Sequence, residues 1–206
     1  MQNSLEDYVR ETLKNDRSGH GYSHAERVRK TALALQKEEG GDPRIIEAAA
    51  LVHDTIDSKL FSDQAHQVSL LQDELVSLGY SPKEIEAILA IITHMSWHLH
   101  DETEKTKEAK IVIDADRLEA LGAIGLVRTI EYGASKGRAF YEENNLAYQN
   151  GKASFKESTE TTLSHFYDKL LKLEGTFYTA TAEKEAKRRS DFLRAFLDEF
   201  YHELSV

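Results

Sequence analysis

Apolar residues recur along this chain at the three- and four-residue spacing of amphipathic helices. In the apolar run that starts at Ile45, a helix would bury Ile45, Ala49 and Val52 on one face. Val, Ile and Thr alternate with polar residues over no useful length, so the pattern predicts little or no strand and an all-α fold. We expect helices near residues 3–15, 23–39, 43–56, 62–79, 82–97, 104–121, 123–136, 153–174 and 180–203.

Some residues mark where the expected helices begin and where a loop lies between them. Asp42-Pro43 offers an N-cap followed by a first-turn proline, and Ser81-Pro82-Lys83-Glu84 has the spacing of a capping box. The polar segment from Gly137 to Gly151 is the longest expected loop. Three phenylalanines at four-residue spacing, from Phe192 to Phe200, indicate packing within the domain or across a homodimer.

Composition narrows the class of protein. The net charge of −10, from 26 basic and 36 acidic residues, argues against a nucleic-acid polymer as partner but leaves room for a small phosphorylated substrate. The chain has no cysteine, so His, Asp and Glu must hold any metal ion, and these ligands suit Mn, Mg, Co, Ni, Fe or Zn. No signal peptide and no membrane span is expected, which favours a cytoplasmic protein.

His53 and Asp54 stand side by side at the end of an apolar helical run. A buried charge is costly there unless it is neutralised, and a divalent metal ion can neutralise it. Neighbouring side chains diverge by about 100° on a helix, so both reach one ion only near the helix end or between their two directions. Asp57, four residues after His53, can face the same site.

Histidine pairs and an aspartate pair extend this set. His20 and His24 are four residues apart, and Arg27 follows His24 by one helical turn. His94 and His98 form a second four-spaced pair at the end of an apolar helix. A further polar group follows the apolar run that ends at residue 113, and it consists of Asp114, Asp116 and Arg117.

The order of these motifs resembles the H…HD…D signature of the HD-domain metal-dependent phosphohydrolases, and in particular a branch of small bacterial HD-domain proteins. The matching pieces are the His20 to Val28 run, Leu51 to Asp54, the Asp-Ala-Asp-Arg-Leu run that begins at Asp114, and a C-terminal helix rich in Phe and Leu that ends at Glu203. They span residues 15–203, nearly the whole chain.

The resemblance implies an all-α helical bundle with a metal site between helices. It implies one divalent metal ion held by four ligands, which are His24, His53, Asp54 and Asp116. Asp116 is preferred because the family's last ligand commonly stands directly before the basic residue of this run. Asp114 is an alternative ligand or a partner of the ligands, and so is His98. Asp57 occupies the place where several branches carry a Glu as general acid or base.

Such a site suits phosphate chemistry, because a metal ion activates water and offsets charge on a phosphoryl group. The candidate catalytic residues are Asp57, Arg27 and His94. The candidate substrate contacts are His20, Arg117, Lys136 and Arg138.

We therefore expect a metal-dependent phosphohydrolase acting on a nucleotide or related small phosphate ester, releasing phosphate or, from a nucleoside triphosphate, pyrophosphate. Two alternatives are a di-iron oxygenase of the HD type, with extra ligands from His94 and His98, and a non-catalytic nucleotide-binding sensor. We expect one domain over residues 1–206, with a core of about 15–135 and a C-terminal helical extension of about 153–203. The sequence does not decide the base, sugar, phosphate number, metal or oligomeric state.

Overall fold

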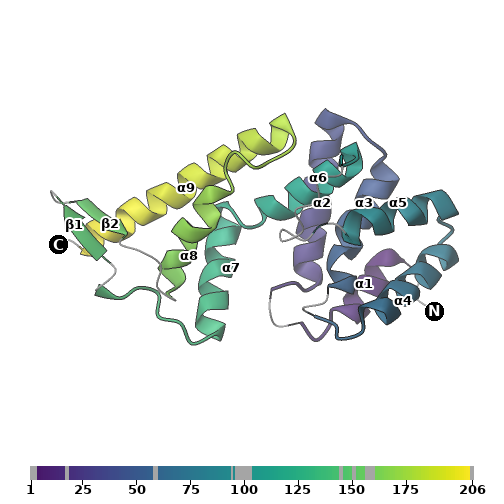
Figure 1. Cartoon of the computed structure of the whole chain (residues 1–206), viewed down its shortest axis with the longest axis horizontal. Helices are drawn as coiled ribbons and strands as arrows, with labels where there is room; N and C mark the ends of the chain where they lie inside the picture. The colour runs from purple at the N-terminus through teal and green to yellow at the C-terminus, as the bar shows by residue number, and fades with distance from the viewer. Residues whose placement is uncertain are drawn as a thin grey trace. The chain divides into compact units, whose positions relative to one another are not determined.

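The computed structural model describes residues 4–16, 19–57, 60–93, 95, 104–143, 146–149, 152–155 and 161–204. The chain divides into two compact units, Met1–Asp116 and Arg117–Val206, each of which is described by itself (Figure 1). The single domain with a core of about residues 15–135 stays a prediction.

Helices build the first unit (Figure 1). They are α1 (Leu5–Thr12), α2 (Tyr22–Glu39), α3 (Pro43–Val52), the 3-10 helix η1 (His53–Ile56), α4 (Gln64–Ser77), α5 (Pro82–Thr93) and α6 (Lys107–Leu118), whose last two residues belong to the second unit. The expected helix near 43–56 is therefore confirmed, but its last turn has the tighter 3-10 geometry.

Helices α3 and α5 begin with the capping interactions that the sequence predicts. The Asp42 side chain accepts hydrogen bonds from the N–H groups of Arg44 (2.9 Å) and Ile45 (3.4 Å), and Pro43 occupies the first turn of α3. Ser81 and Glu84 form the reciprocal bonds of a capping box at the start of α5, at 2.7 and 3.4 Å.

Helix α3 lies at the centre of the first unit and packs against α1, α2 and α5. Because neighbours cover it on several sides, its buried face is wider than one stripe and includes every residue from Ala48 to Val52. The expected burial of Ala49 and Val52 is confirmed. The expectation for Ile45 is wrong, because Ile45 is half-buried and Ile46 takes the fully buried position.

The second unit combines helices with one short hairpin (Figure 1). Its elements are α7 (Gly122–Ser135), β1 (Leu146–Gln149), β2 (Lys152–Phe155), α8 (Thr162–Asp168), the 3-10 helix η3 (Leu170–Lys172) and α9 (Ala180–Leu204). Within this unit α7 packs against both α8 and α9.

A cluster of aromatic rings packs around the buried Phe166 in the second unit. Phe196 of α9 stacks on Phe166 of α8 and on Phe200, with ring centroids 6.3 Å apart in both pairs. Phe140 meets the same cluster edge-on. The packing role expected for the phenylalanine stripe is thus confirmed for Phe196 and Phe200, whereas Phe192 is 45% exposed.

The predicted helix near 153–174 and the predicted loop of residues 137–151 need correction. Strands β1 and β2 pair antiparallel, with Leu146 opposite Phe155 and Gln149 opposite Lys152. The sequence between them is Asn150-Gly151, the strongest short-range hairpin signal, and it outweighs the helical pattern that follows. Helix occupies only the later part of the predicted span, as α8 and η3.

The all-α class is confirmed, because this hairpin is the only strand pair among the described residues. None of the helices in the described part of the chain is long and apolar enough to cross a membrane.

Candidate metal centre

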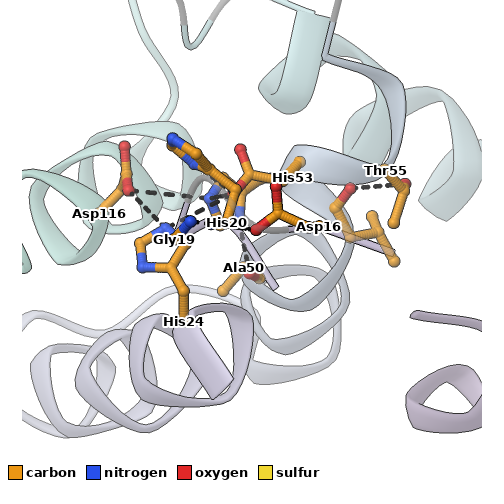
Figure 2. Close-up of polar contacts among 10 residues, drawn as sticks. Asp16, Gly19, His20, His24, Ala50, His53, Thr55 and Asp116 are labelled. Carbon is orange, nitrogen blue, oxygen red and sulfur yellow. Dashed lines mark hydrogen bonds and ion pairs between the residues drawn. The ribbon is translucent and has the colours of Figure 1, made fainter. Parts of the chain in front are cut away.

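Side chains from three segments of the first unit converge on one point (Figure 2). His24 Nε2 lies 3.3 Å from Asp116 Oδ1 and 3.6 Å from Asp54 Oδ2. His53 Nε2 lies 3.2 Å from Asp54 Oδ2 and 3.7 Å from Asp116 Oδ1. Two imidazoles and two carboxylates therefore share one site, which we call the His-Asp cluster, with members His24, His53, Asp54 and Asp116.

The ends of secondary structure elements place these groups. His24 lies in the first turn of α2, where its N–H donates to the carbonyl of Gly21 (2.9 Å), and it is only 1% exposed. The α-helical geometry of α3 ends at Val52, and His53 and Asp54 form the start of η1. Side chains of neighbouring residues on a helix point in different directions, so two of them can reach one ion only near a helix end. His53 and Asp54 lie at such an end.

The backbone orients the His53 ring. Its Nδ1 lies 2.9 Å from the carbonyl oxygen of Ala50, and a carbonyl only accepts, so Nδ1 carries a proton and donates it (Figure 2). Nε2 then faces the cluster. This atom is buried, and no described residue forms a hydrogen bond with it. Metal-ligating histidines typically donate their other ring N–H to a carbonyl in this way.

The charges of the cluster are strongly coupled. Burial alone would raise the pKa of Asp54, but His53 and His20 hold it well below its ordinary value. Burial would likewise raise the pKa of Asp116, and His24 and His53 lower it. Burial would lower the pKa of His53, yet Asp54 and then Asp116 raise it to about 9. Two ionised carboxylates therefore attract positive charge into the site, as imidazole protons or as a cation.

Two overlapping triads can hold a metal ion, His20 with His24 and Asp54, and His24 with His53 and Asp116, each with its ligand atoms within 4.8 Å of one another. Imidazole and carboxylate suit Mn, Fe, Co, Ni and Zn. The buried Nε2 of His53 and the two ionised carboxylates fit a divalent cation.

The structure adds a residue that sequence reasoning missed. Asp16 Oδ2 accepts hydrogen bonds from the N–H groups of Gly19 (3.1 Å) and His20 (2.8 Å), as Figure 2 shows. It thereby orders the turn that brings His20 Nδ1 within 3.0 Å of Asp54 Oδ2. An Asp three residues before a Gly is a turn signal, and this spacing precedes His20 in the sequence.

Three other predicted site residues of the first unit lie outside both triads of described residues. Asp114 is fully buried in α6, and Asp116, two residues later, is the aspartate that reaches the histidines. Asp57 follows η1 directly, and its N–H donates to the carbonyl of Asp54 at 3.2 Å. Arg27 is half-buried on α2.

The remaining predicted residues are in the second unit or outside the described residues. Arg117 Nη1 donates to the carbonyl of Thr176 (2.7 Å), and the guanidinium lies 5.2 Å from the centre of the Tyr178 ring. Lys136 and Arg138 follow the end of α7. His94 and His98 lie outside the described residues.

Comparison with known proteins identifies the family. The HD domain model matches residues 21–121, which include all four members of the His-Asp cluster. The protein YpgQ of Bacillus subtilis (strain 168) is 34% identical over 193 residues, which cover 92% of this chain and 87% of that protein. The chain belongs to the HD-domain family.

Solved structures extend this result. An HD-superfamily hydrolase from Bacillus thuringiensis is 37% identical and has a TM-score of 0.79, over 98% of this chain and 95% of that one. Bacillus subtilis YpgQ in complex with ADP is 31% identical and has a TM-score of 0.77, over 96% and 97% of the two chains. The predicted membership of the HD family is confirmed.

Proposed function

We propose that this chain is a metal-dependent phosphohydrolase that acts on a nucleotide or a related small phosphate ester. The observation that carries the proposal is the convergence of His24, His53, Asp54 and Asp116 at 3.2 to 3.7 Å. The likeness to an HD-superfamily hydrolase supports hydrolysis as the reaction class. The ADP bound to the related YpgQ supports a nucleotide as the class of ligand.

In this proposal the His-Asp cluster holds one divalent metal ion. When bound, the ion lowers the pKa of a water molecule and offsets negative charge on the phosphoryl group. The short distance between Asp116 and His24 supports Asp116 rather than Asp114 as the fourth ligand. The Ala50 carbonyl keeps the His53 proton on Nδ1, which reserves Nε2 for the ion.

The chain's other residues would position the reactants. Asp57 is the proposed acid or base that handles the proton of the attacking water, since it directly follows the segment carrying His53 and Asp54. Arg27 and His94 are the other two proposed catalytic residues. His20, held beside Asp54, is a proposed phosphate contact. Arg117, Lys136 and Arg138 complete the proposed substrate contacts.

A nucleotide panel tests the proposal. The purified chain is incubated with nucleoside mono-, di- and triphosphates and Mn, Mg, Co or Ni, and release of phosphate and of pyrophosphate is measured separately. We expect turnover that requires a metal ion and is lost in Asp54→Ala. Absence of turnover with every nucleotide and metal would overturn the assignment. Metal analysis distinguishes one ion per chain from the two irons of an oxygenase.

The role of Asp57 has its own test. Asp57→Asn keeps the size of the side chain and removes its capacity to take a proton, so we expect retained metal binding with a large loss of kcat. Unchanged turnover in this variant would remove Asp57 from the mechanism and leave the metal assignment untouched.

A further inference from the structure

The second unit contains a pocket that the His-Asp cluster does not use. Its volume is about 480 Å³, within the range of about 300–1,000 Å³ that is typical of small-molecule sites. We call it the α7-end pocket, and it is lined by Tyr132, Lys136, Gly137, Arg138, Ala139, Glu142 and Thr161.

The end of α7 forms one wall of this pocket. Gly137 adopts a left-handed conformation (φ 67°), its N–H donates to the carbonyl of Ala134 (3.0 Å), and the N–H of Arg138 donates to the carbonyl of Gly133 (3.0 Å). These two bonds define a Schellman motif. The motif fixes the backbone that carries Lys136 and Arg138 on either side of Gly137.

The start of α8 braces this turn. The N–H of Thr162 donates to the carbonyl of Ala139 (3.0 Å), and the N–H of Leu163 donates to the carbonyl of Phe140 (2.8 Å). Gly133 permits the close approach, because a Cβ at this position would lie 1.9 Å from Thr162 Oγ1. The pocket is therefore held by backbone bonds on both sides and is formed without a ligand.

Two cations of the α7-end pocket flank one aromatic ring. Lys136 Nζ lies 5.5 Å from the centre of the Tyr132 ring, and Arg138 Cζ lies 5.9 Å from it. Among the described residues, neither cation forms an ion pair with a carboxylate, whereas Arg188, Arg189 and Arg194 of the same unit all do.

The lining of the α7-end pocket has more positive than negative side chains. The pocket lining has one carboxylate, Glu142, against two cations. Burial lowers the pKa of the nearby His165, and the charges of Lys169 and Arg138 lower it further. A cation at a helix C-terminus is favourable by itself, which explains Lys136 as the cap of α7. This interaction with the helix end does not explain why a second cation, Arg138, and a pocket lie beside Lys136.

We propose that the α7-end pocket binds a phosphate or diphosphate group. Arg138 offers paired N–H donors that match phosphate oxygens, and Lys136 adds a compact charge to the lining of the same pocket. The group could come from a phosphorylated substrate or from a free anion. Only the first of these sources rests on the proposed function, because no member of the His-Asp cluster lines the pocket.

Binding of inorganic pyrophosphate to the metal-free chain tests the site. Calorimetry should show binding that weakens at least about tenfold in a Lys136→Gln/Arg138→Gln double variant, since the variant removes both positive charges that line the pocket. The matched control is Lys172→Gln/Lys184→Gln, which removes two exposed positive charges from the same unit outside the pocket. We expect its affinity to stay within about twofold of the parent chain.

Equal weakening in the two double variants, or no weakening in the pocket variant, would overturn the proposal. Each single variant, Lys136→Gln and Arg138→Gln, is measured as well with its melting temperature, so that a folding defect in the double variant does not obscure the result. Each should bind more weakly than the parent chain.

Kinetics then identifies the source of the anion. If the pocket takes a phosphate of the substrate, the double variant raises KM for the nucleotide and leaves kcat nearly unchanged. If it takes a free anion, KM for the nucleotide is unchanged and only pyrophosphate binding is lost, and Lys136 and Arg138 are then not contacts of the substrate. Absence of hydrolase activity would refute the proposed function. The pyrophosphate measurement would still decide whether the α7-end pocket binds an anion.

Discussion

The His53 imidazole shows how a single residue is prepared for metal binding. Its Nδ1 is committed to the carbonyl of Ala50, and its Nε2 is buried beside Asp54 and Asp116. Because the acceptor of this hydrogen bond is a backbone carbonyl, substitution of the Ala50 side chain does not remove it. Cluster geometry at this site therefore depends on the junction between α3 and η1.

Replacement of His53 should abolish tight metal binding. We expect His53→Ala to lose at least about 100-fold in metal affinity, because even the outer partners of ligands contribute about 10–100-fold. Inductively coupled plasma analysis after dialysis, with titration of Mn, measures this. Asp114→Asn is the comparison variant, since Asp114 is buried in the same unit but outside the cluster. Parent-like affinity in His53→Ala would refute the ligand assignment.

Asp16 should matter through the turn that it orders. Asp16→Ala removes the acceptor for the N–H groups of Gly19 and His20, so His20 loses its fixed place beside Asp54. We expect about 1 kcal/mol of lost stability and a rise in KM for the nucleotide. Asp16→Asn keeps an acceptor oxygen and should recover most of both. If Asp16→Ala behaves like the parent chain in both measurements, the turn has no positioning role.

At the scale of elements, Arg29 joins three helices of the first unit. From α2 it forms a bidentate pair with Glu26 (2.8 and 3.0 Å), and it bonds Glu47 of α3 at 2.6 Å. Glu6 of α1 lies 3.9 Å away. The side chain bonds within this group lower the pKa of Glu26 to about 2. The network fixes α2, and with it His24, relative to α3.

This network predicts a pH dependence of stability. A carboxylate whose pKa is lowered on folding stabilises the folded state above its unfolded pKa, and this contribution is lost as the pH falls through the folded value. We therefore expect Glu26→Gln to lower the free energy of unfolding by about 1 kcal/mol at pH 7, because solvent weakens the ion pair of this partly exposed group. The difference in stability between the variant and the parent chain should shrink as the pH falls from about 4.5 toward about 2. Urea unfolding at several pH values measures it.

The control for this measurement is Glu11→Gln, which breaks the exposed pair between Glu11 and Lys14. It should change stability by less than about 0.5 kcal/mol at any pH. A Glu26→Gln effect that does not vary with pH would contradict the electrostatic explanation.

The contact between α7 and α8 makes a second prediction at this scale. An exposed helical Gly→Ala change usually stabilises by about 1 kcal/mol, but Gly133→Ala should destabilise by about 1–3 kcal/mol, because its Cβ would overlap Thr162. Thr162→Ala removes the nearest atom and should recover part of this loss in the double variant. Additive effects of the two changes in chemical denaturation would contradict the contact.

For the whole molecule, metal binding should be linked to folding. A ligand at about 100 times its Kd stabilises the state that binds it by about 2.7 kcal/mol. We expect Mn to raise the melting temperature of the chain, chelation to reverse this, and Asp54→Ala to show neither effect. A metal-induced shift of parent size in Asp54→Ala would indicate that the ion binds elsewhere.

The sequence by itself determined the features that depend on neighbours along the chain. Helix periodicity, the caps at Asp42 and Ser81, and the order of the histidine and aspartate motifs are all local, and they were enough for the all-α class and the HD family. They also indicated His24, His53 and Asp54 as members of one site. Within α3 the same reasoning predicted burial of Ile45, whereas Ile46 is the fully buried residue, because periodicity does not say how many sides of a helix its neighbours cover.

Only the tertiary structure decided what depends on contacts between distant segments. The resemblance favoured Asp116 over Asp114 as a ligand, but only the packing of α6 places Asp116 Oδ1 3.3 Å from His24 Nε2 and leaves Asp114 buried outside the cluster. It also brought Thr162 of α8 against Gly133 of α7, and Glu47 of α3 to Arg29 of α2. Each of these depends on a close approach in space, which a linear pattern does not contain.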